Sequence, residues 1–454
     1  MKGKIARIVL IVLATLLLVS VVACNTNEPL PIPEEFADDY VISPKGRIKA
    51  NTYLRSGEQS ELAFSKWIQA YSEEYPDVVV KPEIIQWSDF GLRIASGDIG
   101  DVFYGCESNV YDYAITHRAA MPLDSYIDRL GIDVQQVFTG LYDLGCANGY
   151  LFMVPSDLCP AVYYTNVSML EEEGISMPDL NWTYDDFKDI CRRVQKTEVD
   201  GSYSQIGLSL DGSFEQYVPW FTGFGGHWVD KVNKKVMLSS DEKVLEGLSE
   251  IVALIQQGYL MVPGLTGEVG AKFANISSPA NFAFQMGTYI NRITYKQAYD
   301  ELGLKMNVTC IPKMPTRVIY GGCTGFFVYS KTKNPDAAAT FALYLLKDDG
   351  QRAFNSSYGG GVPTTKACYN DDYWRFPFSE EEFNYDAFIC YPEAFVGNWP
   401  NVYVPTEVAT PLYEFASKWL TNHFSNRVDY KDTIKETERK CNELWAKLYN
   451  EGNA

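Results

Sequence analysis

The chain has 454 residues and a formal net charge of −19 at neutral pH, and 14% of its residues are aromatic. This length corresponds to two or three domains' worth of buried core and excludes a single small domain. The strong negative charge repels nucleic-acid phosphates, so nucleic acid is not expected as a partner.

The N-terminus has the pattern of an export signal. A basic start, MKGKIAR, precedes an apolar run from Ile8 to Ala23, which is shorter than the roughly 20 residues of a membrane-spanning helix. The run ends in Val-Val-Ala-Cys24, which resembles the bacterial lipobox. We therefore expect residues 1–23 to be a lipoprotein signal peptide and Cys24 to be lipidated. This would hold the chain at the cell membrane, on its extracellular or periplasmic face. The alternative is an ordinary signal peptide that happens to contain a cysteine.

Residues 24–45 are rich in Asn, Pro and acidic residues, and we expect them to form a flexible tether. Beyond them, short β-like runs alternate with amphipathic helices, which is typical of an α/β fold. A first strand is predicted over residues 47–54, and a helix follows whose aromatic residues recur at helical spacing from Phe64 to Tyr75. Residues 78–85 predict a second strand, and Pro82 inside it indicates an edge strand, because proline cannot donate to a central ladder.

Later helices carry boundary signals. Thr183 to Asp186 resembles a capping box, and residues 239–242 resemble a second one, which opens a helix that ends before Gly258. Asn334-Pro335 predicts another helix start. Apolar residues from Ile434 to Leu448 predict a final amphipathic helix.

Cysteine and histidine give no sign of a metal or redox site. The ten cysteines leave nine when Cys24 is set aside, and no Cys-x-x-Cys pair occurs. Several lie in apolar helical stripes, which indicates buried free thiols for most of them, although export permits disulfides. The three histidines are widely scattered. We therefore expect no metal and no cofactor.

A series of segments from residue 47 onward resembles the extracellular solute-binding proteins of ABC importers, in particular the sugar-binding family that includes maltose-binding protein. In chain order, the segments are AYSEEYPDVVV, IASGDIGDVFYG, MPLDSYI, YLFMVPSDLCPAVYYTNVSMLEEEGI, NWTYDDFKDI, FGGHWVD, NFAFQMGTY, IPKMP, GGCTGFFVYSKTKNPDAAATFALYLLKDDGQ and GVPTTKACYND. Each segment alone is weak, whereas their order and spacing over some 400 residues are specific. Thr165-Asn166 stands where the family carries Tyr-Asn, and this departure prevents the ligand of any relative from being inherited.

The resemblance implies a two-lobe, periplasmic-binding-protein-like (Venus flytrap) α/β fold, with mixed central sheets and a multi-segment hinge. By analogy with the family, the first lobe would comprise residues 46–155 plus 325–362, and the second residues 156–324 plus 363–454. A small solute would be held between the lobes, which close around it. The expected partners are this solute, the permease subunits of an ABC importer and the membrane through the lipid anchor, with the protein acting as a monomer.

The resemblance also indicates residues that line the cleft. Tyr104 and Glu107 follow a predicted strand at its carboxyl end, where open α/β sheets place ligands; the alternative is a turn residue and a solvated acid. Asp157 could accept sugar hydroxyls, with a helix cap as the alternative. The other candidates are Tyr217, Trp220, Trp228, Tyr289, Arg292, Asn398 and Trp399.

Each of these side chains suits a carbohydrate, since aromatic rings stack on apolar sugar faces and polar groups bind hydroxyls. Within this set Trp220 is the first choice for an aromatic wall. Arg292 leaves an acidic sugar possible. Trp399 lies beside Pro400, and its alternative role is loop packing.

Two other functions stay open at this point. One is a surface glycoside hydrolase, which needs two carboxylates across a glycosidic bond. No Gly-x-Ser-x-Gly, His-Glu-x-x-His or Walker-type motif occurs, so no enzyme motif supports catalysis and an enzyme is not expected. The other is the same fold binding a non-sugar solute such as a peptide, a polyamine or a metal. The abundance of Tyr and Trp favours sugar, an oligosaccharide in particular.

Overall fold

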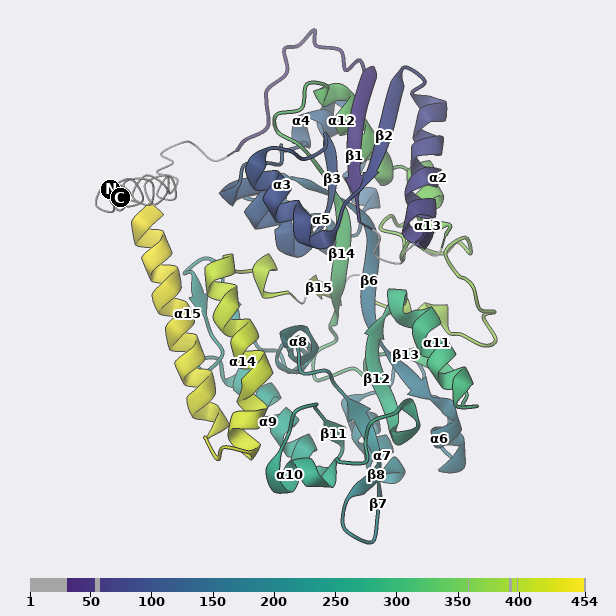
Figure 1. The fold of residues 1–454 in the computed structure, drawn as a ribbon, viewed down its shortest axis with the longest axis vertical. Coiled ribbons are helices and arrows are strands. Elements are labelled where there is room, and N and C mark those ends of the chain that lie inside the picture. The colour runs from purple at the N-terminus through teal and green to yellow at the C-terminus, as the bar shows by residue number, and fades with distance from the viewer. Residues whose placement is uncertain (1–30, 54–57, 358, 392–393, 398, 453–454) are drawn as a thin grey trace, which may run out of the picture.

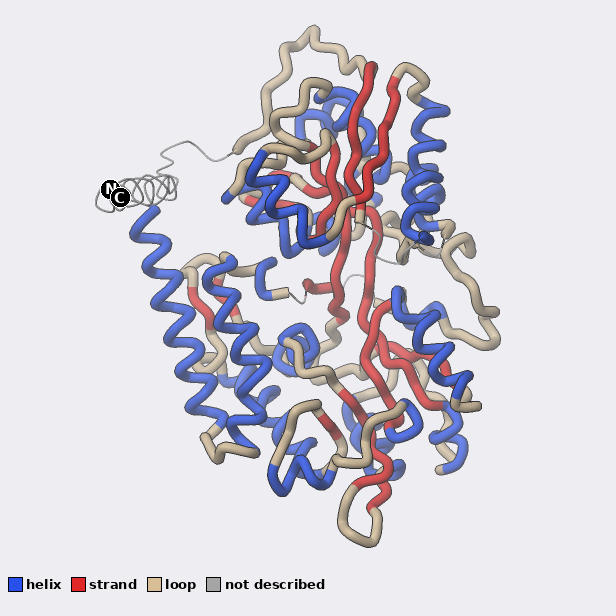
Figure 2. Tube along the Cα trace, in the orientation of Figure 1, coloured by secondary structure: helices blue, strands red, loops and turns tan. Residues whose placement is uncertain are grey.

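The computed structural model describes residues 31–53, 58–357, 359–391, 394–397 and 399–452. Figures 1 and 2 show two halves, each combining strands and helices, joined by a narrow middle through which long strands pass. Each half has its own cluster of buried hydrophobic side chains, which we call the first core and the second core. The predicted two-lobe α/β fold is confirmed. The predicted signal peptide and Cys24 lie outside the described residues.

The first half, uppermost in Figure 1, contains three parallel strands covered by helices. The spacing of Phe64, Trp67 and Tyr71 turns all three side chains of the first helix into the first core. Trp67 stacks on Phe341, with 3.9 Å between ring centroids. The elements are β1 (Gly46–Thr52), α2 (Glu58–Glu74), β2 (Val78–Ile84), α3 (Phe90–Ser96), β3 (Val102–Cys106), α4 (Asp124–Leu130), α5 (Thr139–Leu144), β4 (Cys146–Ala147), β5 (Tyr150–Leu151), α12 (Pro335–Leu343) and α13 (Asp348–Asn355).

The second half, lowermost in Figure 1, holds most of the remaining helices. Its elements are α6 (Val167–Glu172), α7 (Tyr184–Val194), β7 (Lys196–Thr197), β8 (Tyr203–Ser209), α8 (Phe214–Gly223), β9 (Val229–Asp230), β10 (Lys235–Val236), α9 (Glu242–Gln257), β11 (Leu260–Met261), α10 (Gly267–Lys272), β12 (Phe282–Thr288), α11 (Arg292–Glu301), β13 (Met306–Cys310), α14 (Thr406–Phe424) and α15 (Tyr430–Gly452).

Two long strands connect the halves: β6 (Met153–Asn166) and β14 (Ile319–Val328). Eleven of the described strands form one mixed sheet, with the order β11-β8-β12-β6-β14-β3-β1-β2 and with β13, β15 (Phe395–Gly397) and β7 attached to β6, β14 and β8. β6 pairs with β14 as far as Pro160 and with β12 from Ala161 onward. The partner change therefore lies in the middle of β6. β2 is the edge strand, as Pro82 predicted.

The predicted helix boundaries are confirmed with one correction. Thr183 and Asp186 form the capping box of α7, Gly258 ends α9 with a left-handed conformation, and Pro335 is the first residue of α12. The start of α9 was predicted as a capping box led by Ser239, two residues before the actual cap. Asp241 is the actual cap, because its carboxylate accepts hydrogen bonds from the backbone N–H groups of Lys243 and Val244.

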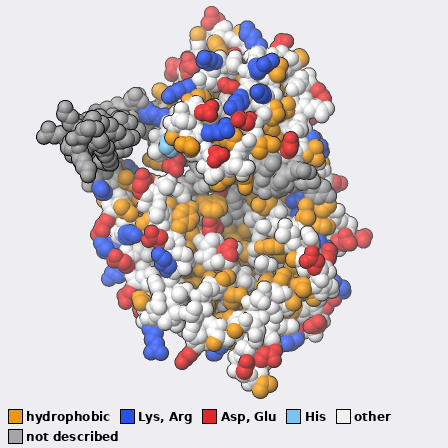
Figure 3. Space-filling model, in the orientation of Figure 1, with side chains coloured by type: hydrophobic (Ala, Val, Ile, Leu, Met, Phe, Trp, Pro, Cys, Tyr) orange, Lys and Arg blue, Asp and Glu red, His pale blue; other side chains and the backbone are white. Residues whose placement is uncertain are grey.

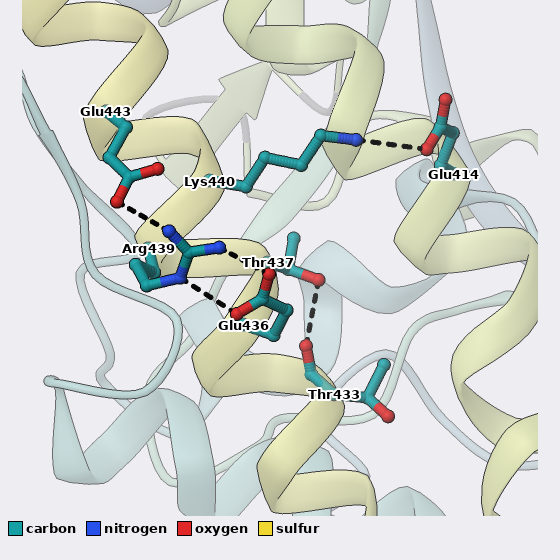
Figure 4. Close-up of polar contacts among 7 residues, drawn as sticks. All are labelled: Glu414, Thr433, Glu436, Thr437, Arg439, Lys440 and Glu443. Atoms are coloured by element: carbon teal, nitrogen blue, oxygen red, sulfur yellow. Dashed lines mark hydrogen bonds and ion pairs between the residues drawn. The ribbon is translucent and has the colours of Figure 1, made fainter.

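The last two helices pack against each other and against the second core. The predicted final amphipathic helix is confirmed as α15, which buries Ile434, Cys441 and Trp445. On its outer face, Arg439 pairs with Glu436 and with Glu443, and Lys440 reaches Glu414 of α14 (Figure 4). These pairs are exposed to solvent and contribute little to stability.

The end of the predicted tether is packed against the first core. Phe36 stacks on Tyr40 and meets the ring of Tyr126 in α4 edge-on. Tyr40 and Tyr126 both donate to Asp336 of α12, at 2.6 and 2.9 Å. The stretch from Phe36 to Tyr40 therefore belongs to the folded body, because two aromatic rings bury apolar area against it.

All nine cysteines in the described part of the chain carry free thiols, and six of them are buried: Cys159, Cys191, Cys310, Cys323, Cys368 and Cys441. The prediction of mostly buried thiols is confirmed.

Candidate functional site

A cavity of about 870 Å³ lies where the two cores meet. Its walls come from the strand ends of the first half, the crossing strands β6 and β14, the end of β12, the start of α8 and the start of α14. Figure 3 shows hydrophobic side chains gathered at this level, around the hollow between the two halves. The lining residues that matter below are Tyr53, Trp87, Tyr104, Glu107, Asp112, Asp211, Glu215, Asn291, Tyr295, Trp399, Asn401, Thr406 and Tyr413.

One wall of the cavity is aromatic. Tyr53 and Trp87 follow the strands β1 and β2, whereas Tyr104 lies within the neighbouring strand β3 and not in the loop expected after it. The three rings meet near the carboxyl ends of these strands. The Trp87 centroid lies 5.7 Å from that of Tyr53 and 6.1 Å from that of Tyr104. Trp87 is 42% exposed, so an apolar face is available to a ligand.

The opposite wall is formed by residues that follow β15. Trp399 is 37% exposed, and its ring centroid lies 6.5 Å from that of Tyr413 in α14. The Tyr413 hydroxyl donates to Oδ1 of Asn401 at 2.8 Å. The Thr406 hydroxyl donates to Asp112 of the first half at 2.9 Å and so connects the two sides of the cavity. The cavity therefore offers aromatic surface and hydrogen-bonding groups on both sides.

Glu107 is a buried carboxyl at the floor of the cavity. Its Oε2 accepts a hydrogen bond from the backbone N–H of Cys323 in β14 at 2.9 Å. Its Oε1 has no hydrogen-bond partner among the described residues. Burial, aided by the nearby Asp157 carboxylate, raises the pKa of Glu107 to about 8. The group is therefore largely protonated at neutral pH and carries a hydroxyl that can donate.

Three further carboxylates line the same cavity: Asp112, Asp211 and Glu215. Burial raises the pKa of Glu215, and one of its oxygens is buried with no partner in the described structure. The described lining contains no Lys, Arg or His. The electrostatic character of the site is accordingly neutral to negative.

Of the ten candidate residues from the sequence, the structure brings Tyr104, Glu107 and Trp399 together in the cavity. Asp157 is buried behind it, where its carboxylate accepts a hydrogen bond from the Thr324 hydroxyl and so joins β6 to β14. Asn398 lies outside the described residues.

Three aromatic candidates lie inside the second core. Trp220 is fully buried against the rings of Tyr184 and Phe187. Tyr217 packs on Trp419, and Trp228 packs on Phe214 and Tyr403. α8 is apolar nearly all round, which is typical of a buried helix. These rings do not line the cavity.

Tyr289 and Arg292 are also buried away from it. The Tyr289 hydroxyl donates to the carbonyl of Trp374. Arg292 donates from Nε to the Phe376 carbonyl at 2.9 Å and from Nη1 to the Tyr289 carbonyl at 3.1 Å. Its guanidinium lies 3.8 Å from the centroid of the Tyr289 ring. The arginine therefore holds the segment around residue 376 and does not line the cavity.

Tyr53 and Trp87 are among the lining residues that sequence reasoning missed. The signal was present, because the rule that places ligands at strand carboxyl ends applies to β1 and β2 as it does to β3. Asp211, Glu215, Asn291 and Tyr295 carried no comparable signal, since only the folded chain brings them to the cavity.

A second, smaller hollow of about 520 Å³ lies behind the segment that follows β15 and shares Glu107 and Asn401 with the cavity. Lys231 and Lys234 lie at its rim, and the Lys231 ammonium is 4.7 Å from the Tyr403 ring centroid.

Within the described ranges, no group of three or more His, Cys, Asp and Glu side chains is placed to hold a metal ion. None of the helices in the described part of the chain combines the length and the hydropathy of a membrane-spanning segment.

The sequence profile of the bacterial extracellular solute-binding proteins matches residues 56–352. This chain belongs to that family. The match covers both crossing strands and most of each core. The family assignment made from the ordered motifs is thereby confirmed.

Solved structures of other solute-binding proteins share the fold of this one. The sugar-binding protein MalE of Xanthomonas citri superposes with a TM-score of 0.71 at 15% identity, over 89% of this chain and 98% of that one. An ABC substrate-binding protein of Listeria monocytogenes, solved with cycloalternan, gives 0.68 at 16% over 88% and 99%. The cyclic α-maltosyl-1,6-maltose binding protein of Arthrobacter globiformis gives 0.69 at 16% over 88% and 99%. These superpositions establish the two-lobe fold of this solute-binding protein. Because the identities are low, they do not identify its ligand.

Proposed function

We propose that this solute-binding protein captures an uncharged carbohydrate, an oligosaccharide, in the cavity between its two halves and delivers it to the permease of an ABC importer. The observation that carries the proposal is the half-exposed ring of Trp87, set between Tyr53 and Tyr104. Aromatic rings of this kind stack on the apolar faces of sugars, and the surrounding hydroxyl, amide and carboxyl groups suit a rim of sugar hydroxyls.

The charge of the cavity narrows the ligand class. Four carboxyl groups and no described cationic side chain line it, so an acidic sugar or a phosphate would meet like charge without a partner. Arg292, which left an acidic sugar possible on sequence grounds, donates to backbone carbonyls instead. Among sugars, the cavity thus favours neutral over acidic ones.

Size and relatives agree with a carbohydrate. A volume of about 870 Å³ falls in the range of sites that take drug-sized ligands and leaves room for more than one sugar ring. Solute-binding proteins of the same fold were solved with cycloalternan and with maltotetraose. These ligands support the class of solute without fixing which sugar is bound.

The working motion would be closure of the two halves about the crossing strands. β6 pairs with β14 up to Pro160 and with β12 from Ala161 onward. The two halves would turn relative to each other at this change of pairing partner. We retain the division into residues 46–155 plus 325–362 and residues 156–324 plus 363–454 as the proposed lobes. Lipidation of Cys24 would hold this receptor close to its permease and raise its effective concentration there. The protein would act as a monomeric binder without enzymatic turnover.

Thermal-shift measurements with four ligand classes test the proposal. A neutral malto-oligosaccharide should raise the melting temperature, because a ligand at 100 times its Kd stabilises the folded state by about 2.7 kcal/mol. An oligouronate, a peptide and a polyamine at equal concentration should have a smaller effect. Stabilisation by the peptide or the polyamine alone would refute the carbohydrate assignment. Release of shorter sugars during incubation would show a glycoside hydrolase.

A further inference from the structure

Four side chains that line the cavity form a continuous chain of hydrogen bonds. The Tyr413 hydroxyl donates to Oδ1 of Asn401 at 2.8 Å, and Nδ2 of Asn401 donates to the Thr406 hydroxyl at 2.9 Å. The Thr406 hydroxyl in turn donates to Oδ2 of Asp112 at 2.9 Å. Asp112 belongs to a helical turn packed in the first core, whereas α14, which carries Thr406 and Tyr413, packs in the second core. The chain therefore runs across the cavity.

Asp112 fixes the direction of every proton in this chain. A carboxylate has no proton to give, so the Thr406 hydroxyl must donate to it and can only accept from Asn401. The Asn401 amide therefore turns its NH2 group toward Thr406 and its oxygen toward Tyr413. The reverse orientation would set the Asn401 oxygen against the Thr406 oxygen with no proton between them. Since Pro405 gives α14 no side-chain cap, the positive end of this helix also favours the charged form of the carboxylate.

The Tyr413 hydroxyl is left as a hydrogen-bond acceptor. A tyrosine hydroxyl has one proton, and the proton of Tyr413 is committed to Asn401. Burial raises the pKa of Tyr413, so the phenol keeps this proton at neutral pH. Tyr413 is half-buried and lines the cavity. A ligand group that reaches its hydroxyl therefore meets an oxygen that accepts and does not donate.

We propose that this chain determines which ligand group the site takes beside Tyr413: a hydroxyl that donates, and not an ether, carbonyl or carboxylate oxygen, which can only accept. The inference rests on the proposed function and adds that the oligosaccharide carries a free hydroxyl at this position. A ligand oxygen without a proton would lie against the Tyr413 oxygen with no hydrogen bond between them, and sites built to bind a hydroxyl discriminate strongly in this way.

Thr406 and Asp112 have a positioning role in this selection. They act on the ligand group through Asn401, because they set which end of its amide meets Tyr413. Thr406 is exposed, so water competes for its bonds until a ligand fills the cavity. A ligand hydroxyl that donates to Tyr413 extends the chain, and the bonds of such a chain strengthen one another once water is excluded.

Deoxyfluoro sugars test the direction of the chain. Thermal-shift screening of malto-, cello- and xylo-oligosaccharides first identifies a sugar that stabilises the wild-type protein. Analogues of that sugar, each with one hydroxyl replaced by fluorine, which cannot donate, are then compared by isothermal titration calorimetry. At the hydroxyl that meets Tyr413, the wild type should bind the analogue about tenfold more weakly than the parent sugar. Tyr413→Phe has no acceptor there and should bind the analogue and the parent sugar alike.

Thr406 variants test whether the chain sets that preference. Thr406→Val removes the hydroxyl and keeps the shape, so the Asn401 amide can turn, Tyr413 can donate, and the loss caused by fluorine should largely disappear. Thr406→Ser keeps the hydroxyl and should restore the loss. Thr410→Val removes a hydroxyl one turn further along α14, which donates to the Thr406 carbonyl at 3.0 Å, and this control should bind like the wild type.

Two results would overturn the inference and leave the carbohydrate assignment intact. One is an equal loss of affinity in the wild type and Tyr413→Phe for every fluorinated analogue. The other is a loss that depends on Tyr413 but persists in Thr406→Val, because the chain would then not set the direction. Failure of every oligosaccharide to stabilise the wild type would instead refute the proposed function, and the inference with it.

Discussion

Replacing Trp87 by alanine tests the aromatic wall directly. The indole follows the carboxyl end of β2, lines the cavity and has 42% of its surface exposed. Its remaining surface touches the rings of Tyr53, Phe90 and Tyr104. Because the indole is already half in solvent, its loss should destabilise the protein less than the loss of a core tryptophan would.

The expected loss of affinity follows from the exposed area. A tryptophan can bury up to about 250 Å², so the exposed fraction amounts to roughly 100 Å². At about 25 cal/mol per Å², covering it with a sugar face contributes at most about 2.5 kcal/mol. Trp87→Ala should therefore weaken binding of the stabilising oligosaccharide by roughly 1 to 2.5 kcal/mol, or about five- to seventyfold.

Isothermal titration calorimetry of the variant beside Trp220→Ala measures this. Trp220 is fully buried in the second core, so its truncation should cost about 3 to 5 kcal/mol of stability and leave the affinity of the folded fraction nearly unchanged. The reasoning fails if Trp87→Ala binds like the wild type, or if folded Trp220→Ala loses affinity as strongly as Trp87→Ala.

Two further predictions concern Glu107 and Cys24. With a pKa of about 8, folded Glu107 keeps its proton over a range in which the unfolded carboxyl, with a pKa of about 4.3, has lost it. Stability should therefore fall as the pH rises from about 4.5 to 8, by up to about 5 kcal/mol, and Glu107→Gln should flatten this part of the profile in urea titrations; an equal slope in both proteins would contradict the assignment. Cys24→Ser should move the protein from the membrane fraction to the soluble fraction with unchanged ligand affinity, and membrane retention of the variant would refute the lipid anchor.

The fold was predictable from the sequence because its signals are local or ordered along the chain. Pro82 indicated an edge strand, Thr183 and Asp186 a helix start, and Gly258 a helix end, and each is found as predicted. Each depends on a few neighbouring residues and on backbone chemistry that tertiary contacts did not override. Asp241 replaced the predicted serine cap because its carboxylate reaches two N–H groups at once.

The site was predictable at Trp399 from a segment that resembles the family, and otherwise only where a strand end supplied the residue. Tyr104 and Glu107 were found in this way, and the same rule applied to β1 and β2 yields Tyr53 and Trp87. Trp220 was chosen because it is aromatic and lies in a segment that lines the cleft in relatives. Trp220 is one of the buried residues of α8, whereas the polar Glu215 and Gln216 of the same helix line the cavity.

Contacts between distant segments could not be read from the sequence. The contact of the Arg317 guanidinium with the ring of Tyr391 depends on the path of the long segment between α13 and β15. The same applies to Arg292, whose partners are backbone carbonyls that carry no residue identity. Any residue type has a backbone carbonyl, so the sequence does not indicate which residues such an arginine binds.

The crossing strands explain why a glycine-rich segment, GGCTG, stands at the centre of the molecule. A Cβ at Gly321 would lie 2.2 Å from the Cys159 carbonyl oxygen of β6, and one at Gly325 would lie 2.3 Å from that of Val154. Glycine at these positions lets β14 approach β6 closely where both strands pass between the cores. Between these glycines, the N–H of Cys323 donates to Glu107. The residue at the cavity floor is thus bonded to the strand about which the halves would close.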